Sequence, residues 1–99
     1  NIVLGSTGGA DLTDGIDNIC IGIIARVKSD ASSNIAIGNA TRALGAEGDI
    51  AIGRAAWSYG TASATSSIAI GNGAQAITIG GSAVNNSIAI GRAVRCSVS

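Results

Sequence analysis

The sequence predicts an all-β solenoid, in which short parallel strands stack into a single elongated domain over residues 1–99. Two observations predict it: a pentapeptide of the form Asn/Ser/Asp-Ile-Ala-Ile-Gly recurs along the chain, and large core-filling side chains are scarce. Hydrophobic residues make up 46% of the chain but are mostly Ala and Ile, with no Phe, one Trp and one Tyr. This composition suits a thin core extended lengthwise rather than a thick globular one.

Each pentapeptide is expected to form a short strand followed by a turn. Seven copies end in a glycine: Gly5, Gly22, Gly38, Gly53, Gly71, Gly80 and Gly91. Large and small residues alternate with a period of two, which is typical of a strand with one buried face. We expect the two large residues to fill the core and the small central residue, such as Ala36, to face a neighbouring backbone. The glycine then permits the turn, and the preceding Asn, Ser or Asp hydrogen-bonds it.

The spacing of these glycines predicts the size of one coil. The first four intervals, of 17, 16, 15 and 18 residues, suit two short strands and two turns per coil. Such coils stack about 4.8 Å apart, like on like. The last two intervals, of 9 and 11 residues, are too short, so residues 71–91 form either one coil of 20 or a tightened part of the roll.

A second strand is expected after each glycine, and counting from the glycine assigns its two faces. The third and fifth residues are small or apolar and should face inward: Ala25, Val27, Thr41, Ala43, Ala56, Ser58, Ala74, Ala76, Val94 and Cys96. The fourth and sixth residues should face outward: Arg26, Lys28, Arg42, Leu44, Trp57, Tyr59, Arg95 and Ser97. Each coil then has an isoleucine-rich strand and a second strand with a polar and aromatic outer face.

The repeated unit, together with second strands such as Ala40-Thr41-Arg42-Ala43-Leu44-Gly45, resembles the head repeat of YadA-like trimeric autotransporter adhesins. Similar repeats occur in phage tail fibres. The resemblance covers essentially the whole chain. It implies a left-handed parallel β-roll, a homotrimer of rolls packed side by side, and an extracellular location on a bacterial surface or a virion. The chain departs from this pattern in the short spacings after Gly71, in the loop at residues 6–17 and in its two cysteines.

Physical reasoning also favours a trimer, because a lone thin roll would leave its alanine face exposed and bury little area per residue. We expect that face to be the inner face of the trimer. Net charge is zero, which gives no electrostatic case for nucleic acid, although residues 1–49 carry −3 and residues 50–99 carry +3. No apolar run reaches the ~20 residues of a membrane span. Since the chain begins with Asn, we interpret it as part of a longer fibre protein.

Trp57 and Tyr59 are the best candidates for contacts with a receptor or glycan. They stand two residues apart and therefore share a strand face, which the register places outward, with Arg42 one coil away and able to stack on Trp57. Exposed aromatic side chains are common binding anchors. The alternative is that they cover a loop, an edge of the roll or a trimer seam.

Cys20 and Cys96 lie too many coils apart for an intrachain disulfide, since bonded cysteines need Cα atoms within about 7 Å. Two interpretations stay open. Both cysteines are small buried hydrophobic residues, or they form an interchain disulfide that links neighbouring subunits.

Three aspartates in the loop at residues 8–17 (Asp11, Asp14 and Asp17) match no calcium-binding motif, so we expect a solvated turn and no metal. Without histidine, the chain has no His-based acid–base or metal chemistry, and we expect no cofactor and no enzymatic activity. A left-handed β-helix of the hexapeptide acyltransferase type would need intervals in multiples of six, and five of the six intervals are not. The sequence therefore predicts a homotrimeric attachment or spacer module, in an adhesin or alternatively in a phage fibre or decoration protein, with a host-cell or matrix receptor or other fibre subunits as partners.

Overall fold

A computed structural model describes residues 1–7, 14–45, 47–60, 66–78 and 86–98, and this part of the chain contains strands and turns only. Two parallel sheets form the two walls of a roll. The isoleucine sheet consists of β1 (Ile2–Leu4), β2 (Ile19–Ile21), β4 (Ile35–Ile37), β6 (Ile50–Ile52), β8 (Ile68–Ile70) and β10 (Ile88–Ile90). The second sheet consists of β3 (Arg26–Val27), β5 (Arg42–Ala43), β7 (Trp57–Gly60), β9 (Gln75–Thr78) and β11 (Arg95–Val98).

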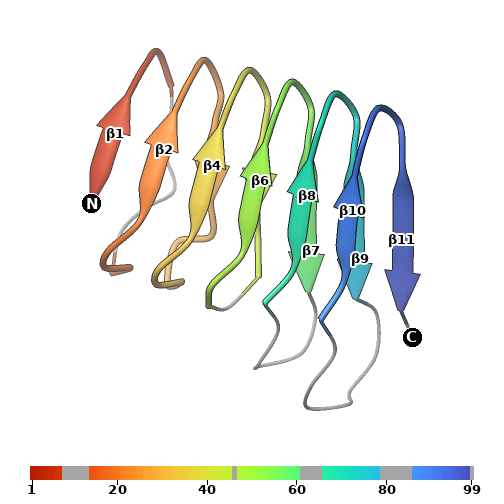
Figure 1. Cartoon of the computed structure of the whole chain (residues 1–99). Coiled ribbons are helices and arrows are strands. Elements are labelled where there is room, and N and C mark those ends of the chain that lie inside the picture. The colour runs from red at the N-terminus through yellow and green to blue at the C-terminus, as the bar shows by residue number, and fades with distance from the viewer. Residues whose placement is uncertain (8–13, 46, 61–65, 79–85, 99) are drawn as a thin grey trace.

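The chain winds as a left-handed β-solenoid, which confirms the predicted fold class. It ascends along each strand of the isoleucine sheet, crosses over the top, descends behind in the second sheet and advances from left to right (Figure 1). Equivalent residues pair from coil to coil without any shift, as in Ala36 with Ala51 and Ala51 with Ala69. This constant register places the same type of side chain at the same position along the whole roll.

The core between the two sheets is built from small side chains. Eleven alanine, cysteine and valine residues have no exposed surface at all: Cys20, Ala25, Val27, Ala36, Ala43, Ala51, Ala56, Ala69, Ala74, Ala76 and Ala89. The inward positions predicted for the second strands are therefore confirmed from Ala25 to Ala76. Val94 and Cys96, in the last coil, are only partly covered.

The predicted orientation of the isoleucine strand is wrong. In each described copy from Cys20 onward the small central residue is buried inside the roll, while the flanking isoleucines face outward. The facing strands also contribute only small inward side chains, such as Ala43 and Ala76, so the narrow interior holds the small central residue of each isoleucine strand. The polar residue that precedes each strand has the same parity as the central residue, and Asn34 and Ala36 accordingly both point inward.

The predicted sixth pentapeptide, residues 76–80, is not a strand of the isoleucine sheet. Ile77 and Thr78 belong to β9, which pairs with β7 and β11 in the second sheet. The next strand of the isoleucine sheet, β10, pairs directly with β8. The step from Gly71 to Gly91 is therefore one coil of 20 residues, and the predicted repeat glycine Gly80 lies outside the described residues.

The turn after each isoleucine strand has a constant backbone conformation. Its first residue is the repeat glycine, at φ 126° in Gly53, and a Cβ added there would lie 2.5 Å from the carbonyl oxygen of Gly71. Two residues later the backbone is left-handed, at φ 56° in Ala55 and φ 59° in Ile24. A β-branched side chain is a rare outlier in that region, so Ile24 carries local strain.

Candidate functional site

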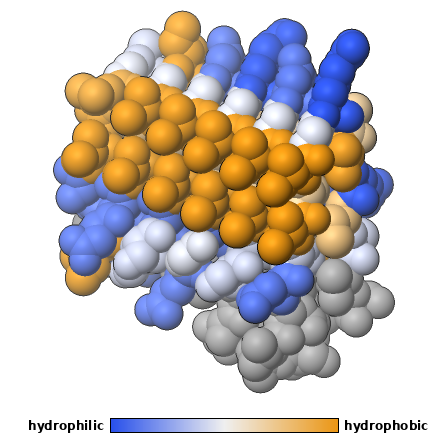
Figure 2. All heavy atoms as spheres, viewed as in Figure 1, coloured by the Kyte–Doolittle hydropathy of each residue, from blue (hydrophilic) through white to orange (hydrophobic). Residues whose placement is uncertain are grey.

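The outer face of the isoleucine sheet is a continuous apolar surface. Its side chains form two rows, one from each isoleucine position of the pentapeptide, which cross the front of the molecule in Figure 2. Ile88 and Ile90 are 58% and 63% exposed at one end, and Ile2 and Leu4 are 52% and 58% exposed at the other. The alanine face that was expected to lie at the centre of a trimer is thus the interior of the single roll, and the outer face of this sheet is made of isoleucine.

The outer face of the second sheet carries the predicted aromatic residues. Arg42 pairs with Trp57 across neighbouring strands, and its guanidinium carbon lies 5.1 Å from the centroid of the Trp57 ring. This cation–π contact confirms the stacking predicted from the sequence and holds the guanidinium in a defined orientation. Trp57 and Tyr59 share the outer face and are half-buried.

Two shallow depressions lie side by side on this sheet. One, of about 280 Å³, is lined by Ala40, Arg42, Ala55, Trp57 and Gln75. The other, of about 370 Å³, is lined by Lys28, Leu44, Tyr59 and Gly60. The structure therefore places all three predicted contact residues, Arg42, Trp57 and Tyr59, at recesses of one face.

The indole nitrogen of Trp57 is a buried donor without a hydrogen-bond acceptor among the described residues. A buried polar group left in this state costs about 1–3 kcal/mol, so it is uncommon in a stable fold. The nitrogen belongs to a residue that lines the smaller depression.

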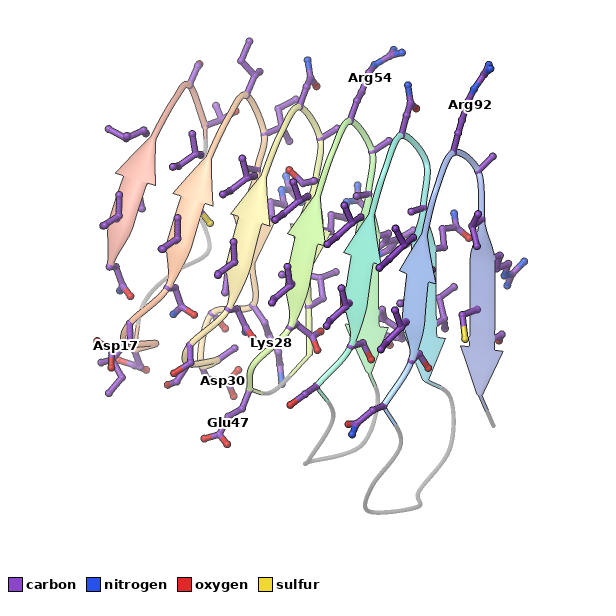
Figure 3. All side chains as sticks on the ribbon, in the orientation of Figure 1. Asp17, Lys28, Asp30, Glu47, Arg54 and Arg92 are labelled. Carbon is purple, nitrogen blue, oxygen red and sulfur yellow. The ribbon has the colours of Figure 1, made fainter. Side chains whose placement is uncertain are left out.

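Acidic side chains gather along the lower edge of the roll, together with Lys28, and two arginines lie along the upper edge (Figure 3). Asp17, Asp30 and Glu47 lie along the lower edge, whereas Arg54 and Arg92 extend from the turns at the upper edge (Figure 3). The ion pair between Lys28 and Asp30, at 3.3 Å, joins two exposed side chains and therefore adds little stability.

Cys20 and Cys96 are not joined by a disulfide within the chain. Cys20 is enclosed between the sheets with no exposed surface, which favours its interpretation as a small buried hydrophobic residue. Cys96 lies half-buried in β11, and an interchain disulfide at this residue stays a prediction.

Asp11 of the predicted solvated loop lies outside the described residues, while Asp14 and Asp17 are exposed. No group of three His, Cys, Asp or Glu side chains that could hold a metal ion occurs in the described ranges. Within those ranges there is also no helix of the length and apolarity that a membrane span requires.

A buried hydrogen-bond ladder runs along the roll, and sequence reasoning assigned these side chains only to turns. The Oδ1 atom of each ladder residue accepts a bond from the backbone N–H of the equivalent residue in the next coil: Asn1 from Asn18 at 2.9 Å, Asn18 from Asn34 at 2.9 Å, Asn34 from Asp49 at 2.6 Å and Asp49 from Ser67 at 2.9 Å. The recurrence of Asn, Asp or Ser at the parity of the small central residue is the sequence signal for this ladder.

Asp49 is the one ladder member that ionises. Its side chain has no exposed surface, and this desolvation raises the pKa of the carboxyl above its ordinary value. Hydrogen bonds from the Ser67 N–H, the Ser58 hydroxyl and the Gly45 N–H oppose the shift but are outweighed. The group serves the ladder and has no opening to the surface.

Comparison of the chain with protein-family models, with curated proteins and with solved structures gives no match. Fold and function therefore rest on the residues themselves.

Proposed function

We propose that this chain is a non-enzymatic module of an extracellular fibre, which assembles as a homotrimer through the outer face of its isoleucine sheet and serves in attachment. The observation that carries the proposal is the two unbroken rows of outward isoleucines on a parallel sheet. Soluble monomers rarely expose an apolar surface of this extent, and large exposed patches mark interaction sites.

The proposed partner is a second and third copy of the same chain. The apolar rows run the full length of the sheet, so identical rolls packed side by side match along their whole length. Such packing removes the isoleucine side chains from water and contributes a stabilising term of about 25 cal/mol per Å² of apolar surface buried. The resemblance of the repeat to YadA-like adhesin heads supports three copies rather than two.

Light scattering coupled to size-exclusion chromatography tests the assembly. We expect a single species with three times the mass of the chain. A monodisperse folded monomer at micromolar concentration would contradict the proposal.

A matched pair of substitutions tests the face. Ile52→Asn places an amide in the centre of the isoleucine sheet and should shift the mass towards monomer. Ile77→Asn makes the same chemical change at a half-buried position in the second sheet and should leave the trimer intact. Equal effects of both variants would show that the isoleucine face is not the interface.

A further inference from the structure

The outer face of the second sheet collects most of the positive charge of the chain. Its outward positions form two columns that run across the strands: Arg26, Arg42, Trp57, Gln75 and Arg95 in one, and Lys28, Leu44, Tyr59, Ile77 and Ser97 in the other. Four of the six basic residues of the chain lie in these columns and none of its six acidic residues does, while Lys28 at one end is paired with Asp30. We call this surface the basic face.

We propose that the basic face binds an acidic polysaccharide that lies across the strands, along the axis of the solenoid. The proposal rests on the proposed function, because it names the class of ligand to which the fibre module attaches. Since the basic face and the isoleucine sheet lie on opposite sides of the roll, the basic face stays open when the isoleucine sheet is covered.

The arginines supply the contacts that an acidic sugar requires. Arg42 is held on the Trp57 ring, and in the described part of the chain neither Arg42 nor Arg95 has a carboxylate within ion-pairing distance. A planar guanidinium binds a carboxylate or sulfate through two parallel hydrogen bonds. Because the ring already orients Arg42, little rotamer freedom is lost on binding.

The spacing along the face suits a linear polymer with regularly placed anionic groups. Arg42 in β5 and Arg95 in β11 are separated by three strand intervals, or about 14 Å at the usual spacing of neighbouring strands. Between them lie Trp57 and Gln75, where amphipathic and amide side chains offer contacts to sugar hydroxyls and ring C–H groups.

Other polyanions fit the face less well. Single-stranded nucleic acid is generally held by bases stacked on free aromatic rings, but Arg42 covers the ring of Trp57. An acidic peptide is flexible and loses more conformational entropy than a stiff sugar polymer when it lies along a flat surface.

The single tryptophan of the chain allows a direct test, because its fluorescence reports on this face alone. Size-defined heparin fragments and hyaluronan fragments are titrated into the full-length chain at 0.15 M salt. We expect saturable change in Trp57 emission with at least one of them; heparin would identify a sulfated ligand and hyaluronan a carboxylate-only one. No response to either polymer would overturn the proposal.

Arginine variants separate a specific site from general electrostatic attraction. Arg42→Gln should weaken binding about tenfold, which is the loss expected for one charge-assisted contact, and Arg42→Lys should weaken it less. Arg54→Gln removes the same charge at the upper edge of the roll and should change affinity less than twofold (Figure 3). Equal losses in Arg42→Gln and Arg54→Gln would overturn the proposal.

Competition and mass measurements complete the test. Polyglutamate or single-stranded DNA of matched charge should compete poorly, and competition as effective as that of the polysaccharide would overturn the assignment of ligand class. Light scattering on the same samples keeps the two proposals distinct. A trimer that binds no polysaccharide contradicts only the ligand, whereas a monomer that binds it contradicts only the assembly.

Discussion

Asn34 accepts a hydrogen bond from the backbone N–H of Asp49 through its Oδ1 atom at 2.6 Å, and it donates to the Gly45 carbonyl oxygen at 3.3 Å through Nδ2. One buried amide thereby joins two neighbouring coils and also closes the turn within its own coil. Asn18 has the same arrangement with Asn34 and Ala31. The ladder satisfies backbone groups at places where the strands of the isoleucine sheet begin.

Replacing Asn34 with alanine should lower the free energy of unfolding by about 1–3 kcal/mol, because the Asp49 N–H then stays buried without an acceptor. Urea unfolding at a fixed protein concentration measures the change, since the stability of an oligomer depends on concentration. Asn39→Ala provides the control, because Asn39 lies exposed on a turn. Similar losses in the two variants would contradict a structural role for the ladder.

Stability should rise as the pH falls through the window between the raised pKa of Asp49 in the folded protein and its ordinary pKa in the unfolded chain. The folded state holds a proton on this carboxyl more tightly than the unfolded chain does, because burial disfavours the charged form. The folded protein therefore bears the full desolvation cost above the raised pKa and loses it progressively below. The window extends from the ordinary pKa of an aspartate up to the raised value.

Asp49→Asn isolates this effect, because an amide does not ionise in that window. Its Nδ2 group would meet the Gly45 N–H, which donates to Oδ2 of Asp49 at 2.7 Å in the native chain, so the variant should be less stable at every pH. We expect the pH dependence of its unfolding free energy to be flatter than that of the native chain between pH 4 and 7. Superimposable pH profiles, apart from a constant offset, would show that Asp49 does not titrate as described.

Ile24→Asn should stabilise the protein by about 1 kcal/mol, because asparagine tolerates the left-handed backbone that strains a β-branched residue. Ile24 is 40% exposed, so its substitution also removes some apolar burial, and the gain is measured against a control that loses burial in the same way. Thermal unfolding measures the change. Ile23→Asn is the matched control: Ile23 is 53% exposed, its φ is not positive, and no gain in stability is expected. A gain in both variants would show that replacing a partly exposed isoleucine with a polar residue, and not relief of backbone strain, stabilises the protein.

After reduction of any interchain disulfide, Cys96 should react with a maleimide in the folded protein, whereas Cys20 should react only after unfolding, because a buried thiol is inaccessible. Mass spectrometry should show one adduct under native conditions and two in denaturant. Electrophoresis without reductant tests the interchain disulfide: a band of twice the chain mass should persist in Cys20→Ser and vanish in Cys96→Ser. Two adducts formed at the same rate in the native state would contradict the burial of Cys20.

The parallel solenoid and the faces of the second strands were predictable from the sequence, because the glycine spacing fixes the length of a coil and the period-two pattern fixes parity. The stacking of Arg42 on Trp57 followed from the same register. The orientation of the isoleucine strand was predicted wrongly, since burial of large apolar residues is the usual rule for a sheet that covers a core. That rule fails where both walls of a roll are close together.

Parity could have corrected the orientation. Asn34 and Ala36 lie on the same face of the strand, so the polar ladder is buried if Ala36 is buried and exposed if Ala36 is exposed. Nothing within a single coil shows that the amide reaches the backbone of the next coil, because the ladder exists only between coils. The coil at residues 71–91 was ambiguous for a related reason: Ile77 continues the second strand in a pattern that imitates the repeat.

The unshifted register has a consequence for how such a protein changes in length. Removing residues 35–49 would join Asn34 to Ile50, and β6 would then occupy the place of β4 beside β2 with every pairing type retained. The molecule can thus be shortened or extended by whole coils, each of about 4.8 Å, while the outer faces of both sheets keep their arrangement. Each added coil lengthens the apolar rows and adds outward positions for ligand contacts. The strength of assembly and the length of the ligand-binding surface therefore increase together with the number of coils.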